Sequence, residues 1–295
     1  MEKAKRILIL GAKGMLGSDL CFIFKENKPV CWDRQDLNIT DRKEVKNKIK
    51  KLKPEIVINV AAYTNVEMAE KEFSLAKKIN AEAVKYLART CAEIGAIFIH
   101  YSTDYVFDGK NKNGYQENDI HQNPINRYGL SKLLGEKQIL DLRLKIPDFK
   151  FYLIRTSWLF GSKTEPSKHK NFVQMILKLA KERKDLKIIN DQFGKPTYTF
   201  DLAKATKKLL ASNKPFGTYH LLNEGATTWY QFAKEIIRIA GLKTKISPCR
   251  TFEYQTLAKR PKYSILLNTK LSKLRSWKMA LKDYIKGFVS DDMSE

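Results

Sequence analysis

Short apolar runs alternate with amphipathic segments along the first half of the chain. Four runs are nearly continuous and rich in β-branched residues, at 6–12, 54–63, 95–103 and 150–158. Runs of this kind are typical of strands that are covered on both faces. Helical periodicity marks the segments between them, at 41–52, 73–94 and 128–143. This series of strand-helix-strand units predicts an α/β fold with a doubly wound parallel sheet and right-handed crossovers.

A glycine-rich turn follows the first strand. The sequence ILGAKGMLG puts Gly11, Gly14 and Gly17 between that strand and a helix expected to begin near Met15. Glycines at such a turn let the backbone approach a pyrophosphate, whose charge then lies at the helix N-terminus. A second strand, PVCWD, ends about 20 residues downstream in Asp33, where an acidic side chain meets the adenosine ribose. The context predicts a Rossmann dinucleotide site rather than a plain tight turn.

The charged residues beside this turn do not decide between NADH and NADPH as the cofactor. Asp33 favours NADH because its carboxylate accepts a hydrogen bond from a free 2′-hydroxyl and repels a 2′-phosphate. Arg34 follows it directly, and Lys13 lies inside the glycine turn; both can neutralise that phosphate. We expect both cofactors to work, with a modest preference for NADPH.

The pattern becomes mixed after about residue 160. The sequence predicts a strand at 217–223, a lysine-rich tail from 244, and helices near 170–183, 200–212 and 228–240. No glycine-serine linker marks a boundary, so the two parts are expected to pack tightly. We expect a dinucleotide-binding domain at 1–160, to whose sheet the strand at 217–223 returns. Residues 161–295 are then mainly a smaller, discontinuous α/β substrate-binding domain.

A formal charge of +23 raises the question of a nucleic-acid partner. The lysines are spread along the chain, and the densest run, KNKIKKLK at 46–53, is typical of the solvated face of a helix that buries Val45, Ile49 and Leu52. We expect the charge to attract small anionic substrates and expect no nucleic-acid partner.

Four cysteines lie in apolar or mixed sequence without Cys-x-x-Cys spacing, at Cys21, Cys31, Cys91 and Cys249. This favours buried thiols in a reducing cytosol over disulfides or a zinc site, and no other metal site is predicted. No apolar stretch approaches the roughly 18 residues of a membrane span, and no export signal is evident. We expect a cytoplasmic protein.

Two Tyr-x-x-x-Lys pairs in the sequence are candidates for proton transfer in catalysis. Tyr128 and Lys132 open the helix that follows the strand ending at Thr103, at the carboxyl edge of the sheet where such folds bind ligands. Tyr230 and Lys234 lie far from the glycine turn, in a segment whose neighbouring aromatic and aliphatic residues have core-like spacing. We therefore assign the chemistry to the first pair and a structural role to the second.

Longer strings carry a family resemblance over nearly the whole chain. The glycine turn, Thr103 and the Tyr128–Lys132 pair resemble the extended short-chain dehydrogenase/reductases. STDYVFDG, YGLSKLLGE, RTSWLFG, INDQFGKPT, and GTYHL followed by TTWYQFA resemble the dTDP-4-dehydrorhamnose reductases among them. The resemblance implies reduction of the 4-keto group of dTDP-4-dehydro-L-rhamnose, a dTDP-sugar, with hydride from NADPH or NADH.

The resemblance also implies roles for individual residues. Tyr128 gives the proton, Lys132 lowers the pKa of Tyr128 and holds the nicotinamide ribose, and Thr103 hydrogen-bonds the substrate carbonyl. The cofactor is expected to contact Gly11, Lys13, Gly14, Met15, Leu16, Gly17, Asp33, Arg34, Asp36, Leu37, Ala61, Ala62, Tyr63, Thr64, Tyr128 and Lys132. The substrate is expected to contact Val66, Thr103, Asp104, Tyr105, Trp158 and Arg260. Arg260 matches a family arginine that meets the diphosphate.

Three positions depart from the family pattern and keep alternatives open. Glu67 stands where aspartate is usual, Met68 where lysine is common, and Asn268 where aspartate is frequent. Glu67 and Met68 lie near the expected sugar pocket, so another nucleotide-sugar reductase or an epimerase stays possible. A non-catalytic regulatory subunit on the same fold is a further alternative, although it has no need of a complete Thr103, Tyr128 and Lys132 set. The sequence leaves open a homodimer.

Overall fold

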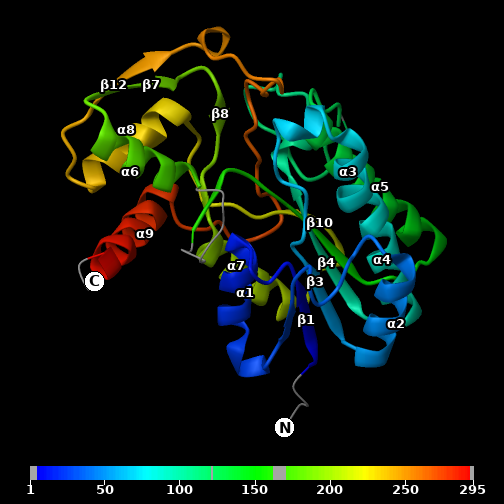
Figure 1. Cartoon of the computed structure of the whole chain (residues 1–295). Helices are drawn as coiled ribbons and strands as arrows, with labels where there is room; N and C mark the ends of the chain where they lie inside the picture. Colours follow the sequence, from blue (N-terminus) through cyan, green and yellow to red (C-terminus); the bar gives the residue numbers. More distant parts are fainter. Residues whose placement is uncertain (1–4, 121, 162–170, 293–295) are drawn as a thin grey trace.

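A six-stranded parallel sheet forms the centre of the molecule (Figure 1). The computed structural model describes residues 5–120, 122–161 and 171–292. The strands of the sheet are β1 (Ile7–Leu10), β2 (Val30–Trp32), β3 (Ile56–Asn59), β4 (Ile97–Thr103), β5 (Phe151–Thr156) and β10 (Gly217–His220). Their order is β10-β5-β4-β3-β1-β2, and every neighbouring pair is parallel. The predicted doubly wound sheet is confirmed, and the strand expected at 217–223 lies at its edge.

Helices cover both faces of this sheet (Figure 1). One face is covered by α1 (Met15–Ile23) and α7 (Thr199–Leu210), and the other by α2 (Arg42–Leu52), α4 (Ala83–Glu93) and α5 (Arg127–Lys145). In β1, Ile7 and Ile9 belong to the sheet core on the side of α1 and α7, whereas Leu8 and Leu10 belong to the sheet core on the opposite side. Successive side chains of a strand point to opposite faces, so continuous apolar strands are what two covering layers require.

The predicted helices are present, with one interruption. In α2 the side chains of Val45 and Ile49 are fully buried, as the lysine-rich pattern predicted. The segment 73–94 is divided into α3 (Phe73–Lys77), a π-helical turn η3 (Lys78–Glu82) and α4. Such π-helical turns are often found at functional sites.

A second apolar cluster lies beside the sheet, at the upper left of Figure 1. It is built from α6 (Phe172–Glu182), α8 (Trp229–Ile239), α9 (Trp277–Asp292), β7 (Asp185–Ile189) and β12 (Lys245–Cys249). The sequence reading missed α9 and β12 inside the lysine-rich tail. In α9 the buried residues Trp277, Leu281, Tyr284 and Ile285 have helical spacing, which was the available signal.

Short elements connect these layers. They are η1 (Lys25–Asn27), η2 (Met68–Glu70), η4 (Asp104–Val106), η5 (Thr251–Glu253), β6 (Leu159–Phe160), β8 (Phe193–Gly194), β9 (Thr197–Tyr198) and β11 (Thr227–Thr228). One of them, η4, lies at the carboxyl end of β4 and carries Asp104 and Tyr105 of the candidate site.

The cysteine prediction is half wrong. Cys91 and Cys249 are buried free thiols, as expected. Cys21 and Cys31 instead form a disulfide, with Cα atoms 6.6 Å apart. The crossover from α1 to β2 brings the end of the helix beside the strand, a proximity that the spacing of the two cysteines in the sequence does not reveal.

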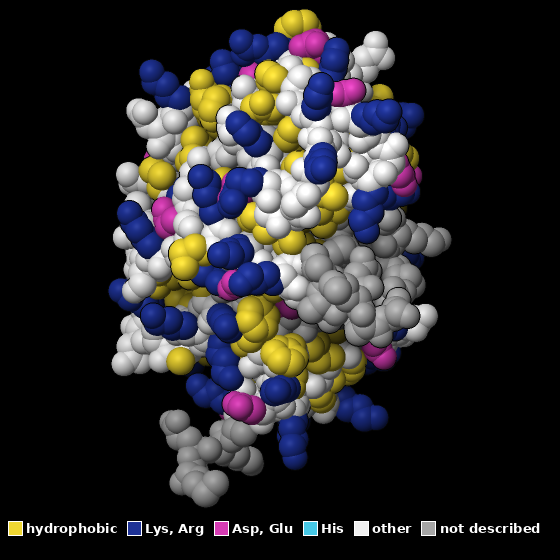
Figure 2. All heavy atoms as spheres, turned by 90° about the vertical axis from the view of Figure 1, so that its left-hand side faces the viewer, with side chains coloured by type: hydrophobic (Ala, Val, Ile, Leu, Met, Phe, Trp, Pro, Cys, Tyr) yellow, Lys and Arg dark blue, Asp and Glu magenta, His cyan; other side chains and the backbone are white. Residues whose placement is uncertain are grey.

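Basic side chains are dispersed over the surface. Figure 2 shows one face, on which Lys and Arg are spread among apolar and uncharged side chains over its whole height. Among the described residues, no helix is both long enough and apolar enough to cross a membrane.

Candidate active site

The glycine turn lies at the point where the winding of the sheet reverses. β2 lies on one side of β1 and β3 on the other, so the crossovers diverge there, and in open α/β sheets the ligand crevice lies at this point, outside the carboxyl ends of the strands. Gly11 has φ +83°, and a Cβ built on it would lie 2.7 Å from the Ala61 nitrogen. A Cβ on Gly17 would lie 2.1 Å from the Gly11 carbonyl oxygen. Only glycine fits both positions, and Gly14 begins α1 without a side-chain cap, so this backbone fits a dinucleotide pyrophosphate.

The residues after β2 form the far end of this crevice. Asp33 accepts a hydrogen bond from the Gln35 backbone N–H at 2.7 Å and forms an ion pair with Lys13. The Lys13 contact, followed by the Gln35 N–H, lowers the pKa of Asp33 below its ordinary value. Arg34 is exposed beside them. Of the other residues assigned to the cofactor here, Asp36 accepts from the Asp33 N–H at 2.9 Å, whereas Leu37 is buried in the core.

The loop after β3 forms the opposite wall. Asn80, from the π-helical turn, accepts from the Tyr63 N–H at 2.9 Å and donates to the Tyr63 carbonyl oxygen at 2.9 Å. The same amide donates to the Ser131 hydroxyl on α5 at 2.9 Å. Asn80 therefore fixes this loop against the helix that carries Tyr128. Ala61 and Ala62 are partly buried on this wall, and Thr64 is exposed.

The proposed catalytic residues meet at the carboxyl end of β4. Thr103 ends that strand, and Asn126 caps the N-terminus of α5 by accepting from the Gly129 N–H at 2.7 Å, which starts the helix just before Tyr128. Thr103 and Lys132 are buried and Tyr128 is partly buried. The Thr103 hydroxyl donates to Asp104 at 2.8 Å. It must turn away from Asp104 before it can donate to a substrate oxygen.

Burial governs the acidity of these groups. It raises the pKa of Tyr128 above its ordinary value, and the nearby Asp104 carboxylate adds to this, while a hydrogen bond with Thr103 opposes it. Burial also raises the pKa of Asp104 to about 6. The expected lowering of the Tyr128 pKa by Lys132 is therefore not seen in this structure: burial raises that pKa, and the groups that oppose the rise are Thr103 and Arg260 rather than Lys132.

Lys132 has an unusual environment for a lysine. Its Nζ donates to the Tyr101 carbonyl oxygen at 2.6 Å and lies 3.4 Å from His100 Nε2. Burial lowers the pKa of Lys132 to about 8, and the negative charge of Glu136 one turn later only partly opposes this. Glu136 also forms an ion pair with Arg155 at 2.7 Å, so the negative charge of Glu136 is shared between Arg155 and Lys132.

The sequence reading missed the support behind Lys132. The Asn59 side-chain oxygen accepts from the Ala61 N–H at 3.2 Å, which turns its NH₂ group toward His100 Nδ1, 3.1 Å away. Burial, followed by the positive charge of Lys132, keeps the pKa of His100 well below its ordinary value, so the ring beside Lys132 is neutral. Polar residues inside the apolar strands β3 and β4 were the available signal.

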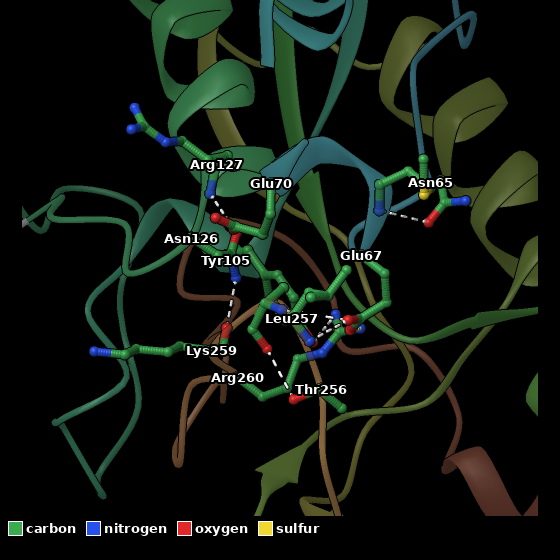
Figure 3. Close-up of polar contacts among 12 residues, drawn as sticks. Asn65, Glu67, Glu70, Tyr105, Asn126, Arg127, Thr256, Leu257, Lys259 and Arg260 are labelled. Atoms are coloured by element: carbon green, nitrogen blue, oxygen red, sulfur yellow. Dashed lines mark hydrogen bonds and ion pairs between the residues drawn. The ribbon is translucent and has the colours of Figure 1, made fainter. Parts of the chain in front are cut away.

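The expected substrate side is closed by the loop at 254–261. Figure 3 shows Arg260 of this loop lying against Tyr105 and Glu67. The Arg260 guanidinium is 2.6 Å from Glu67 and 3.5 Å from the Tyr105 hydroxyl. Tyr105 in turn meets the edge of the Tyr128 ring, with centroids 6.0 Å apart. The structure thus brings Arg260 together with Tyr105 and Tyr128; Val66, in the loop that also carries Glu67, is partly buried.

Trp158 stacks on a residue that the sequence reading did not assign to the site. Its ring lies parallel to that of Trp229, with centroids 3.6 Å apart. Trp158 also has φ +46°, an uncommon conformation for a bulky residue. A Cβ on Gly194 would lie 2.4 Å from the Trp158 ring, so Gly194 is needed for this placement. We infer that the indole position is fixed by its surroundings.

The second Tyr-x-x-x-Lys pair lies outside this site. Tyr230 is partly buried and Lys234 exposed on α8, whereas Phe232, Ile236 and Ile237 of the same helix enter the second apolar cluster. This placement agrees with the structural role predicted for the pair.

A cavity of about 550 Å³ lies at the opposite edge of the sheet. Its lining residues precede the strands or end the helices, and they include Lys5, Lys50, Lys53 and Lys150. Because ligands of open α/β sheets bind at the carboxyl ends of the strands, this cavity is separate from the candidate site.

The comparisons with known proteins agree with this arrangement. The model of the RmlD substrate binding domain family matches residues 5–290. The dTDP-4-dehydrorhamnose reductase of Aggregatibacter actinomycetemcomitans is 36% identical, over 94% of this chain and 97% of its own length. This chain belongs to the dTDP-4-dehydrorhamnose reductase family. The crystal structure of the Bacillus anthracis dTDP-4-dehydrorhamnose reductase in complex with NADP is 36% identical, with a TM-score of 0.90 over 97% of this chain and 100% of that one.

The family includes proteins with other names. The spore coat polysaccharide biosynthesis protein SpsK of Bacillus subtilis is 39% identical, over 95% of this chain and 97% of its own length. A protein of Streptomyces niveus named dTDP-4-keto-6-deoxy-D-glucose reductase is 34% identical, over 94% of this chain and 95% of its own length. Members of this family are therefore named for different keto sugars.

Proposed function

We propose that this chain reduces the 4-keto group of dTDP-4-dehydro-L-rhamnose with NADPH, giving dTDP-L-rhamnose. The observation that carries the proposal is the meeting of Thr103, Tyr128 and Lys132 at the carboxyl end of β4, beside a glycine turn that fits a dinucleotide. The names of the reductase relatives and the NADP complex of the Bacillus anthracis protein support the substrate and the cofactor.

Each residue has a physical task in this reaction. NADPH, held by the glycine turn and the residues after β2, supplies the hydride when it is bound. Tyr128 holds a proton at its hydroxyl and gives it to the substrate oxygen as negative charge develops there. The raised pKa of Tyr128 keeps that proton in place at neutral pH. Lys132 supplies positive charge near the tyrosine, and Thr103 orients the oxygen once its hydroxyl has turned from Asp104.

The pH dependence of turnover should reflect the loss of the proton from the Lys132 ammonium group. Its pKa of about 8 means that the ammonium is lost as pH rises through about 8, so kcat/KM for reduction should fall there. An ordinary lysine would hold its charge to above pH 10. In Lys132→Arg, which stays charged, turnover should be slower but the decline near pH 8 should disappear. An unchanged decline in Lys132→Arg would assign it to another group.

Cofactor preference should depend on Arg34. Because Lys13 is already paired with Asp33, Arg34 is the cation that we assign to a 2′-phosphate. Arg34→Ala should lower the ratio of kcat/KM for NADPH to that for NADH by roughly 1.4- to 5-fold, the effect of about 0.2 to 1 kcal/mol from one exposed charge pair. Arg42→Ala, which removes another exposed arginine, is the matched control. If the ratio of kcat/KM for NADPH to that for NADH is the same in the wild type and in Arg34→Ala, Arg34 does not contact the 2′-phosphate.

A second candidate is the reduction of dTDP-4-keto-6-deoxy-D-glucose, favoured by the name of the Streptomyces niveus relative. The test offers each keto sugar separately with NADPH and follows the loss of absorbance and the identity of the product. The L-rhamno substrate is made from dTDP-glucose with the two upstream enzymes. Higher kcat/KM for that substrate supports the first proposal, whereas higher kcat/KM for the D-gluco sugar supports the second.

A further inference from the structure

Three donors of one loop converge on the carboxylate of Glu67 (Figure 3). Arg260 Nη2 lies 2.6 Å from Glu67 Oε1. The backbone N–H groups of Leu257 and Ala258 donate to Glu67 Oε2 at 2.7 and 3.3 Å. A guanidinium with two consecutive backbone N–H groups is a typical arrangement for binding an anion. We call Leu257, Ala258 and Arg260 the anion cradle.

The cradle is fixed to the catalytic part of the molecule. Next to it, the Lys259 carbonyl oxygen accepts from the Asn126 side chain at 2.9 Å, and Asn126 is the N-cap of the helix that carries Tyr128. Arg260 also lies over the Tyr105 ring, 5.8 Å from its centroid. The cradle therefore lies within the candidate substrate site rather than on a remote surface.

We propose that Glu67 competes with the substrate for this cradle and so sets the affinity for the sugar nucleotide. The proposal rests on the proposed function, since a dTDP-sugar carries a diphosphate. A diphosphate brought to Arg260 would face the Glu67 carboxylate at close range, and two anions cannot share one guanidinium without repulsion. Glu67 must turn out of the cradle. Its side chain is 34% exposed, so solvent can receive it.

Glu70 offers a matched comparison on the same segment. Its carboxylate accepts from the Arg127 backbone N–H at 2.8 Å, at the start of the catalytic helix (Figure 3). It is three residues from Glu67 and carries the same charge, but it holds a different partner. A general effect of removing negative charge from this loop would appear in both positions, whereas competition for the cradle belongs to Glu67 alone.

The test measures dTDP binding by calorimetry, with NADPH binding as a check on folding. Glu67→Gln keeps an oxygen for the backbone N–H groups but removes the charge, and it should bind dTDP on the order of 5- to 30-fold more tightly, as expected for losing one or two charge-assisted contacts. Glu70→Gln should bind dTDP as the wild type does. Arg260→Met should weaken binding, and adding Glu67→Gln to it should give a smaller gain than in the wild type, because only the two backbone N–H groups remain to be freed.

The results separate the possibilities. A gain in dTDP affinity in Glu67→Gln that shrinks when Arg260 is replaced supports the competition. Weaker or unchanged dTDP binding in Glu67→Gln would overturn it and would mean that Glu67 only orients Arg260. An equal gain in Glu70→Gln, or a gain that is undiminished in the Arg260→Met background, would also overturn it. If NADPH binds but neither the wild type nor any variant binds dTDP, the proposed function fails together with this inference.

Discussion

Tyr128→Phe should lower kcat by roughly 10²- to 10⁴-fold, the contribution typical of general acid catalysis. The change removes the hydroxyl that holds the proton and keeps the ring, whose edge contact with Tyr105 has centroids 6.0 Å apart. Packing at the start of α5 is therefore preserved, and the Kd of NADPH should stay nearly unchanged. Steady-state rates and a fluorescence titration with NADPH measure the two effects.

Tyr230→Phe is the matched control for this experiment. The residue has the same spacing to a lysine but lies on α8, where it is partly buried and outside the candidate site. Its replacement should leave kcat within about twofold, since a surface substitution away from the site has an effect within roughly ±0.5 kcal/mol. Equal losses of activity in the two variants would contradict the assignment of Tyr128 as proton donor.

Glu136→Gln should lower the free energy of unfolding by about 3 to 5 kcal/mol. Glu136 and Arg155 form an ion pair at 2.7 Å, with side chains that are 0% and 2% exposed. The other groups near the guanidinium, His220 Nε2 and the Glu117 carbonyl oxygen, are each 3.5 Å away and carry no compensating charge. Removing the carboxylate charge leaves a buried cation without a counterion. Urea denaturation followed by circular dichroism gives the change.

An exposed ion pair provides the comparison. Glu44 and Lys48 lie 2.8 Å apart on α2, and both side chains are partly exposed. Glu44→Gln should cost only about 0.3 to 0.5 kcal/mol, because water screens the pair. If Glu136→Gln cost as little as Glu44→Gln, water would have to reach Arg155, and the burial of this ion pair would be refuted.

The sequence alone was enough to predict the parallel sheet and the edge of that sheet at which the candidate site lies. Continuous apolar runs predicted strands covered on both faces, and β1, β3, β4 and β5 lie within those runs. The order of strand, glycine turn and helix placed Gly11 and Gly17 correctly, because only glycine tolerates the contacts made there. Thr103 is the last residue of a predicted strand, and Tyr128 is the first residue of the predicted helix that follows it. The order of these elements along the chain was therefore enough to place both residues at the carboxyl edge of the sheet. These features are local, and periodicity and turn chemistry encode them directly.

Contacts between distant segments were decided only by the tertiary structure. Glu67 and Arg260 are separated by 193 residues, and Asn59 and His100 by 41. The disulfide between Cys21 and Cys31, where the cysteine spacing had favoured free thiols, depends on how the chain returns from α1 to β2. The raised pKa of Tyr128 and the lowered pKa of Lys132 depend on how much water the surrounding layers remove. A sequence pattern shows which face of an element is apolar, but the partner that a polar side chain meets depends on the packing of elements remote in the chain, and no local periodicity records it.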